Sequence, residues 1–321
     1  MKIELVELTL PLPTLERICT DCARLVGPQD QPVEEILTAV SEFIFVTEKR
    51  FDEVIESAIG SVGQPIPTAD DRKPIRAGKA ISSNGPGGIV TSRVFIRESI
   101  VVPIVYYSCQ PQDTVEECRY VISHEIGHSW DFFIRRVVPP KELTDDERHI
   151  KPFRIQTAAD YHSLRLGFEV AACVNSVRAV SKELFSRRYK LTRDRVCECK
   201  EFIERELGKL RSEVVEAREA SYLVNAALWS VLAECAKIFA TMSANTRLSD
   251  GYRHPWVDTP WENVLRRHLE VVRTLVNSYP HWPADAMMPV RDVLRTLGTE
   301  LFNCRFVEGE SEDHVVVYGA D

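Results

Sequence analysis

The sequence predicts an α+β protein that is mostly helical and contains a small β-sheet. Two runs, Ile89–Arg97 and Ile100–Tyr107, are rich in β-branched and aromatic residues, which is the composition of strands. Most of the remaining chain repeats its apolar residues at helical spacing. Residues 61–88, which precede the first run, are rich in Gly, Pro, Asp and Ser and are therefore expected to form a loop.

The elements before and after this loop follow from local signals. Two N-terminal helices are expected, around Leu15–Leu25 and through Pro32–Ile59, because apolar residues recur at helical spacing in both. After the loop come the two strands, and Pro103 inside the second favours an edge strand or a bulge.

The next helix is expected to begin with Thr114 as its N-cap, because Glu117 stands three residues later as in a capping box. It is expected to end near Val137, since Pro139 and Pro140 cannot continue a helix.

The remainder is expected to be helical, with helices near residues 160–187, 192–219, 221–243, 261–279 and 286–302. An acidic stretch at Glu308–Asp313 precedes His314–Tyr318, which is expected to be a small strand or a frayed tail. The expected division is an N-terminal helical segment, the loop, a core, a C-terminal helical region and an acidic tail, at residues 1–60, 61–88, 89–190, 191–305 and 306–321.

The composition argues against several classes of protein. The 321 residues are 44% hydrophobic and 27% charged, as in an ordinary globular protein. A net charge of −8 argues against general binding to nucleic acid or to anionic membranes, both of which favour a basic surface. No stretch approaches the roughly 20 consecutive apolar residues that cross a bilayer.

The cysteines and the N-terminus favour a cytoplasmic protein. The nine cysteines are odd in number and scattered, which is not the pattern of a disulfide framework. Glu4 and Glu7 stand where a signal peptide would need apolar residues. Two pairs, Cys19-x-x-Cys22 and Cys197-x-Cys199, could supply thiolates to a structural zinc, but both lie in helical patterns and are more simply buried or surface thiols.

The strongest chemical signal is His124-Glu125-x-x-His128. Residues four apart on a helix lie one above the other, about 5–6 Å between Cβ atoms, so two imidazoles can share one Zn²⁺ at ~2.0–2.1 Å. Glu125 projects about 100° away from His124 and can hold a metal-bound water as a general base without binding the metal. The alternative is a solvated face that carries two histidines and a glutamate.

The surroundings of the motif favour the metal site. An apolar stripe at helical spacing lies away from both histidines, so one side of the helix can pack on a core while the other faces a cleft. Its residues are Val115, Cys118, Ile122, Ile126, Phe133 and Val137. Gly127 lies inside this helix and indicates the close approach of another backbone.

A catalytic zinc needs a third protein ligand. Glu169 is the first candidate, because an ionised carboxylate in an apolar helical run is expected to be paired or bound to a cation. Glu234 is the second, although Lys237 three residues later offers it a local partner. The weaker candidates are His149, Asp160 and His162. For the group that stabilises the oxyanion, Tyr161, His162 and Tyr222 stay open.

Two strands, then Arg119–Ser123 leading into HEIGH, then a later helix with Glu169 followed by Ala172, resemble the gluzincin-type zincin metallopeptidases. Among these the chain is most similar to the ImmA/IrrE-like family, over about residues 88–185. The resemblance implies a zincin-like core, His124 and His128 as zinc ligands with Glu169 as the third, and Glu125 as general base. It also implies proteolysis of a regulatory protein, commonly a DNA-binding repressor.

The predicted function is therefore zinc-dependent hydrolysis of a peptide bond, with a protein or peptide, such as a transcriptional regulator, as substrate. One of the two predicted strands, Ile89–Arg97 or Ile100–Tyr107, is expected to bind the substrate as an added strand. The alternative is a helical interaction or regulatory protein whose site is structural or inactive. Basic residues at Arg187–Lys190 are interpreted as a solvated junction between helices rather than a binding surface.

Overall fold

The structure is a computed structural model. It describes residues 1–59, 77–84, 86–137, 158–211, 217–249, 261–283, 286, 288–302, 304–307 and 314–317. The chain forms two compact units, Met1–Glu147 with Ala171–Leu184, and Arg148–Val170 with Phe185–Asp321. The protein is mostly helical and has a small mixed sheet of four strands, in agreement with the predicted α+β class.

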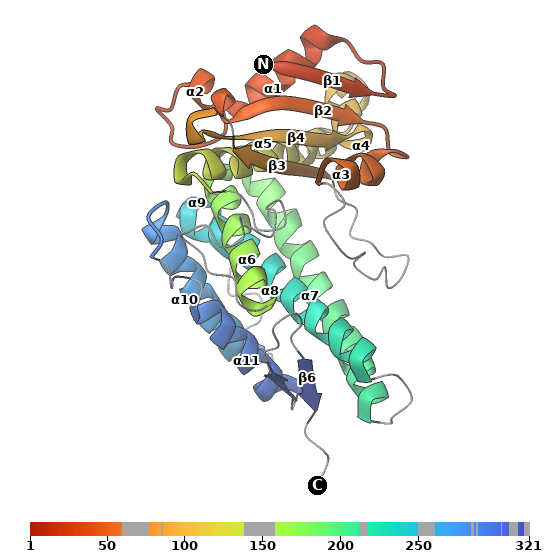
Figure 1. The fold of residues 1–321 in the computed structure, drawn as a ribbon, viewed down its shortest axis with the longest axis vertical. Helices are drawn as coiled ribbons and strands as arrows, with labels where there is room; N and C mark the ends of the chain where they lie inside the picture. Colours follow the sequence, from red (N-terminus) through yellow and green to blue (C-terminus); the bar gives the residue numbers. More distant parts are fainter. Residues whose placement is uncertain are drawn as a thin grey trace. The chain divides into compact units, whose positions relative to one another are not determined.

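The sheet belongs to the first unit. Its strands are β1 (Lys2–Val6), β2 (Val40–Val46), β3 (Gly78–Asn84) and β4 (Val90–Arg97). Figure 1 shows them side by side in the order β1-β2-β4-β3. β1 and β4 flank β2 in parallel, whereas β3 pairs with β4 in the antiparallel sense. β1 and β3 are therefore the two edges, and the predicted strand at Ile89–Arg97 is confirmed as β4, an inner strand.

The predicted N-terminal helices are only partly correct. The first is present as α1 (Leu12–Ala23), but the second, Pro32–Ile59, is replaced by α2 (Val33–Thr38), β2 and α3 (Phe51–Ile59). In β2, six of the seven residues are buried, because parallel neighbours flank it and helices cover it. Such a buried strand is a nearly continuous apolar run, which periodicity alone does not distinguish from a buried helix.

The loop predicted at residues 61–88 contains the edge strand β3. Its sequence, GKAISSN, is small and polar, so its pairing with β4 and not its composition makes it a strand. Residues 60–76 and residue 85 lie outside the described part of the chain.

The strand predicted at Ile100–Tyr107 is wrong, because this segment forms the helix α4 (Glu98–Val105). Val101 and Ile104, three residues apart, are its buried side chains. Pro103 lies inside the helix and cannot donate to the carbonyl of Ser99, but the thiol of Cys118 lies 4.0 Å from that oxygen. A weak sulfur contact thus replaces the missing backbone bond.

Helices cover both faces of the sheet. On one face, α3 packs through Phe51 and Ile55 on Ile44, Ile81 and Phe95. The other face carries α5 (Gln112–Arg135), which contacts β3 and β4 and also packs against α1 and α4. Because side chains alternate along a strand, β3 directs Ile81 toward α3 and the preceding Ala80 toward α5.

α5 confirms the helix predicted over the motif, although the predicted start at Thr114 is wrong. The N-cap is Pro111, three residues before the predicted cap, and Pro111 makes no capping hydrogen bond with its side chain. Arg136 adopts a left-handed conformation and ends the helix. The two prolines expected to stop it lie outside the described residues.

The remaining helices are α6 (Ala158–Asn175), α7 (Lys182–Arg211), α8 (Ala217–Ala244), α9 (Thr246–Ser249), α10 (Glu262–Ser278) and α11 (Met288–Phe302). The predicted helix at 160–187 is interrupted between Asn175 and Lys182. Ser181 explains the new start, because its hydroxyl accepts a hydrogen bond from the amide of Leu184. The basic run Arg187–Lys190 therefore lies inside α7 and not at a junction.

Two further features belong to the second unit. The predicted strand at the end of the chain is present as β6 (His314–Val317), which pairs with β5 (Cys304–Val307). One segment of α8, Ala227–Ala244, is long and apolar enough to cross a membrane, but 56% of it is buried inside the protein. The core helix of a globular protein meets the same criteria, so this segment is weak evidence for a membrane protein.

Candidate metal centre

α5 presents both histidines of the motif on one face. Their ring centroids lie 4.8 Å apart with the rings almost perpendicular, and both side chains are half-buried. The predicted apolar stripe is largely confirmed on the opposite side, where Val115, Ile122 and Ile126 are buried. The helix therefore packs on the core through this stripe and leaves the two imidazoles partly accessible.

Gly127 lies between the two histidines and allows α6 to approach α5 closely. A Cβ added at this position would lie 2.9 Å from the carbonyl oxygen of Ala172, closer than side chains are tolerated. The side-chain amide of Asn175 donates a hydrogen bond from Nδ2 to the backbone carbonyl of Gly127, 3.1 Å away. The close approach predicted from this glycine is therefore confirmed.

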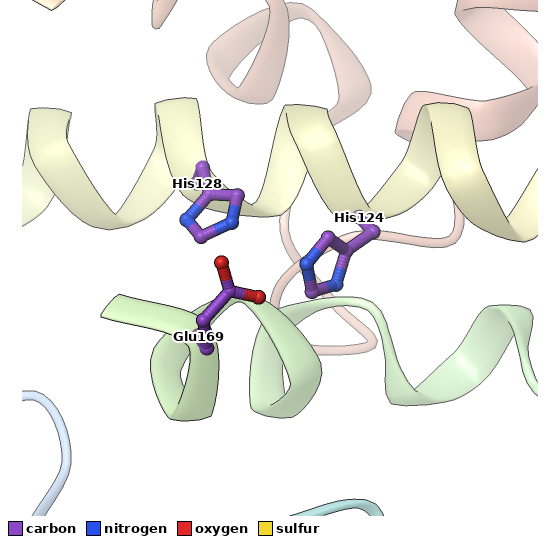
Figure 2. Close-up of side chains that lie close together, drawn as sticks. All are labelled: His124, His128 and Glu169. Atoms are coloured by element: carbon purple, nitrogen blue, oxygen red, sulfur yellow. The ribbon is translucent and has the colours of Figure 1, made fainter. Parts of the chain in front are cut away.

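Glu169 lies one helical turn before Ala172. The helix α6 is continuous, so the turn that carries Glu169 directly precedes the turn that packs on Gly127. One ligand atom each from His124, His128 and Glu169 lie within 4.8 Å of one another. Figure 2 shows the Glu169 carboxylate directed toward the two imidazoles.

This group fits a metal ion. Two donors that share one Zn²⁺ at ~2.0–2.1 Å lie at most about 4.2 Å apart, so a small movement of the side chains closes the set. Two imidazoles and one carboxylate are a donor set found at catalytic zinc. Among the described residues, no other group of three or more His, Cys, Asp or Glu side chains converges in this way.

The alternative ligand Glu234 is held in ion pairs. Its carboxylate oxygens lie 3.1 Å from Arg195 and 3.2 Å from Lys237. Burial alone would raise the pKa of Glu234, but the charges of Lys237 and Arg195 outweigh burial and lower it. Lys237 also lies 3.6 Å from the carboxylate of Glu169. The same lysine therefore contacts both candidate ligands, Glu169 and Glu234.

The carboxylate of Glu125 reaches the edge of the sheet. It is buried, and it accepts a hydrogen bond of 2.9 Å from the amide of Ala80 on β3. Two residues earlier, Gly78 leaves room for it, because an added Cβ would lie 2.7 Å from the Cγ of Glu125. The predicted general base is thus fixed beside the edge strand.

Sequence reasoning missed a cluster behind His124. The Tyr120 hydroxyl lies 3.4 Å from His124 Nδ1 and 3.7 Å from the thiol of Cys173. The spacing of four residues between Tyr120 and His124 was a usable signal, since such residues share a helical face. Gly78 was also missed, and so was the contact of Lys237 with Glu169, because both depend on tertiary structure.

Five further sequence candidates have side chains that the structure does not describe. His149 lies outside the described residues, as do the side chains of Asp160, Tyr161, His162 and Tyr222. Cys19 and Cys22 are buried in α1, and burial raises the pKa of both thiols, to about 12 at Cys22. They are neutral thiols of the first unit's core.

Comparison with known proteins gives no match to this chain among protein-family models, curated proteins or solved structures.

Proposed function

We propose that this protein is a zinc-dependent metallopeptidase with a zincin-like core of the gluzincin type. The observation that carries the proposal is the convergence of His124, His128 and Glu169, with their ligand atoms within 4.8 Å of one another. Zinc is favoured because two imidazoles and a carboxylate suit it and leave a fourth position open for a reactant.

Zinc bound by these residues would lower the pKa of a water molecule and polarise the carbonyl of the scissile bond. Glu125 is the residue of this chain suited to move the proton. It would take a proton from the attacking water and return it to the leaving nitrogen. Its hydrogen bond to Ala80 holds one carboxylate oxygen at the sheet edge.

The edge strand β3 supports a peptide as substrate. The Arg97 amide donates to the carbonyl of Ala77, and in an antiparallel pair the direction of such bonds alternates along the strand. The backbone groups of Gly78, Ala80, Ser82 and Asn84 therefore point away from β4, and the amide of Ala80 donates to Glu125. A substrate bound as an added strand would lie along this edge, beside Glu125.

This placement replaces the strands expected from the sequence. Ile89–Arg97 is paired on both sides, and Ile100–Tyr107 is largely helical, so neither offers a free edge. The resemblance to the ImmA/IrrE-like family extends the proposal to a regulatory protein as substrate. The scattered cysteines extend it to a cytoplasmic location.

Metal content is the first test. The purified protein is expected to carry one equivalent of zinc, and His124→Ala is expected to lose it, because one of the three ligands is gone. Glu125→Gln is expected to retain zinc, since this side chain is not in the ligand set. Cleavage of fluorescein-labelled casein and of an internally quenched peptide library is then measured for all three proteins.

The wild type is expected to cleave and Glu125→Gln to be inactive with its zinc in place. A wild-type protein that purifies without metal and cannot be reconstituted with Zn²⁺ would overturn the proposal and favour an interaction protein. Cleavage by Glu125→Gln at the wild-type rate would remove the proposed general base.

A further inference from the structure

The hydroxyl of Tyr120 lies directly behind one candidate ligand. Tyr120 is one turn before His124 on α5, and only 3% of its surface is exposed. Its oxygen is 3.4 Å from His124 Nδ1, at the long end of the hydrogen-bond range, and the two ring centroids are 5.6 Å apart. Nδ1 of His124 therefore faces the protein, and Nε2 is the nitrogen available to a metal.

Cys173 completes this cluster from α6. Its thiol is 1% exposed and lies 3.7 Å from the Tyr120 hydroxyl and 4.0 Å from His124 Nδ1. Cys173 is four residues after Glu169, so one face of α6 supplies both the third candidate ligand and a neighbour for the hydroxyl. Both helices of the metal centre thus contribute to the surroundings of His124.

The hydrogen-bonding capacity of these groups allows an arrangement that suits a metal ligand. A neutral imidazole carries a proton on one nitrogen and a lone pair on the other, and the metal takes the lone pair. A metal-binding histidine almost always donates its other N–H to a nearby acceptor, which fixes its tautomer. Tyr120 can accept from His124 Nδ1–H and donate its own proton to the sulfur of Cys173, a weak acceptor.

We propose that Tyr120 is a positioning residue for the metal ligand His124, and that its hydroxyl holds the Nδ1–H tautomer with Nε2 free to bind the ion. The inference rests on the proposed metal centre and adds a residue to it. The tyrosine acts through the histidine and touches neither metal nor substrate.

Tyr120→Phe is the sharpest test, because it removes one oxygen and retains the buried ring. Zn²⁺ affinity is measured by competition with a chromophoric chelator. The variant is expected to bind Zn²⁺ about 10–100-fold more weakly, the usual loss when an outer partner of a ligand is removed. Tyr107→Phe is the matched control, because Tyr107 is 60% exposed, and it is expected to bind as the wild type does.

A second measurement separates positioning from packing. In the metal-free protein labelled with ¹⁵N-histidine, the nitrogen shifts of His124 report which nitrogen carries the proton. The wild type is expected to show the Nδ1–H form, and Tyr120→Phe a mixture of both tautomers. A loss of stability without this change would be a packing effect and would overturn the inference.

The outcomes also separate this inference from the proposed function. A wild type that binds zinc and a Tyr120→Phe variant that binds it equally well would overturn the role of Tyr120 alone. A wild type that binds no zinc would overturn the proposed function and the inference together.

Discussion

The carboxylate of Glu125 accepts a hydrogen bond from the backbone amide of Ala80 across 2.9 Å, which links the helix of the metal centre to the edge of the sheet. Gly78 makes this contact possible, because any larger residue would occupy the space of the Glu125 side chain. The position of the proposed general base thus depends on a glycine that is far from the motif in sequence.

Gly78→Ala is therefore expected to displace Glu125 while leaving the three ligands in place. In a strand, Ala normally loses less conformational entropy than Gly, so the free energy of unfolding is expected to change little. Cleavage is expected to fall about 100-fold, the order of loss for a catalytic group misplaced by about 1 Å. Zinc content and the rate of casein cleavage are the measurements.

Gly208→Ala is the control for this substitution. Gly208 lies in α7, and an added Cβ there meets no atom within 4 Å. The control is expected to keep full activity and to gain up to about 1 kcal/mol of stability from helix propensity. Equal activity of Gly78→Ala and the wild type would show that Glu125 does not depend on this contact.

Gly127→Ala is expected to destabilise the protein, although replacing glycine by alanine inside a helix usually stabilises it. The propensity term favours Ala by about 1 kcal/mol, but the new methyl would lie 2.9 Å from the backbone oxygen of Ala172. Backbone yields less easily than a side chain, so α5 and α6 must separate. Urea denaturation should show destabilisation, and zinc titration a weaker site, because Glu169 moves with α6. A stabilised variant would contradict this packing.

Glu169 and Glu234 form a matched pair for identifying the third ligand. Both contact Lys237, and their side chains are 26% and 25% exposed. Glu169→Gln is expected to weaken zinc binding more than about 100-fold, since even outer partners of ligands are worth about 10–100-fold. Glu234→Gln is expected to change the affinity less than about fivefold, because a partly exposed ion pair contributes about 0–1 kcal/mol.

Competition titration with a zinc chelator compares the two variants directly. The opposite order, with Glu234→Gln the weaker binder, would make Glu234 the ligand and Glu169 its ion-paired neighbour. Equal and small effects would mean that neither carboxylate binds the ion.

The sequence was sufficient to predict that His124, His128 and Glu169 lie close together, because local geometry determines much of this grouping. The spacing of His124 and His128 requires only a helix, and Gly127 signals the approach of its neighbour. Glu169 could be identified because a charged residue in an apolar helical run needs a partner.

The parts that could not be predicted depend on tertiary pairing. β2 is a buried inner strand whose apolar run also suits a helix, and β3 is a strand because β4 lies beside it. The edge that Glu125 contacts, and Gly78 on it, were therefore hidden in a predicted loop. Lys237 was seen as a local partner of Glu234, but its contact with Glu169 needs the fold.

A buried histidine in the second unit gives a pH prediction that is independent of the metal. Nε2 of His268 on α10 lies 2.8 Å from the carbonyl oxygen of Leu232 on α8 and donates its N–H to that oxygen. Burial lowers the pKa of His268 to about 4, although the bond to the carbonyl opposes this shift. The folded protein therefore holds this imidazole neutral near neutral pH.

Because the folded pKa lies below the unfolded value of about 6.5, the unfolded chain takes up this proton first as the pH falls. The stability of the wild type should therefore decrease below pH 6.5, by about 2 kcal/mol at pH 5 from this residue alone. His268→Phe removes the effect and loses one hydrogen bond, worth about 1 kcal/mol. Urea denaturation should find the variant less stable at pH 7.5 and more stable at pH 5. If the difference in unfolding free energy between the wild type and His268→Phe does not change with pH, His268 has the same pKa in the folded and the unfolded state.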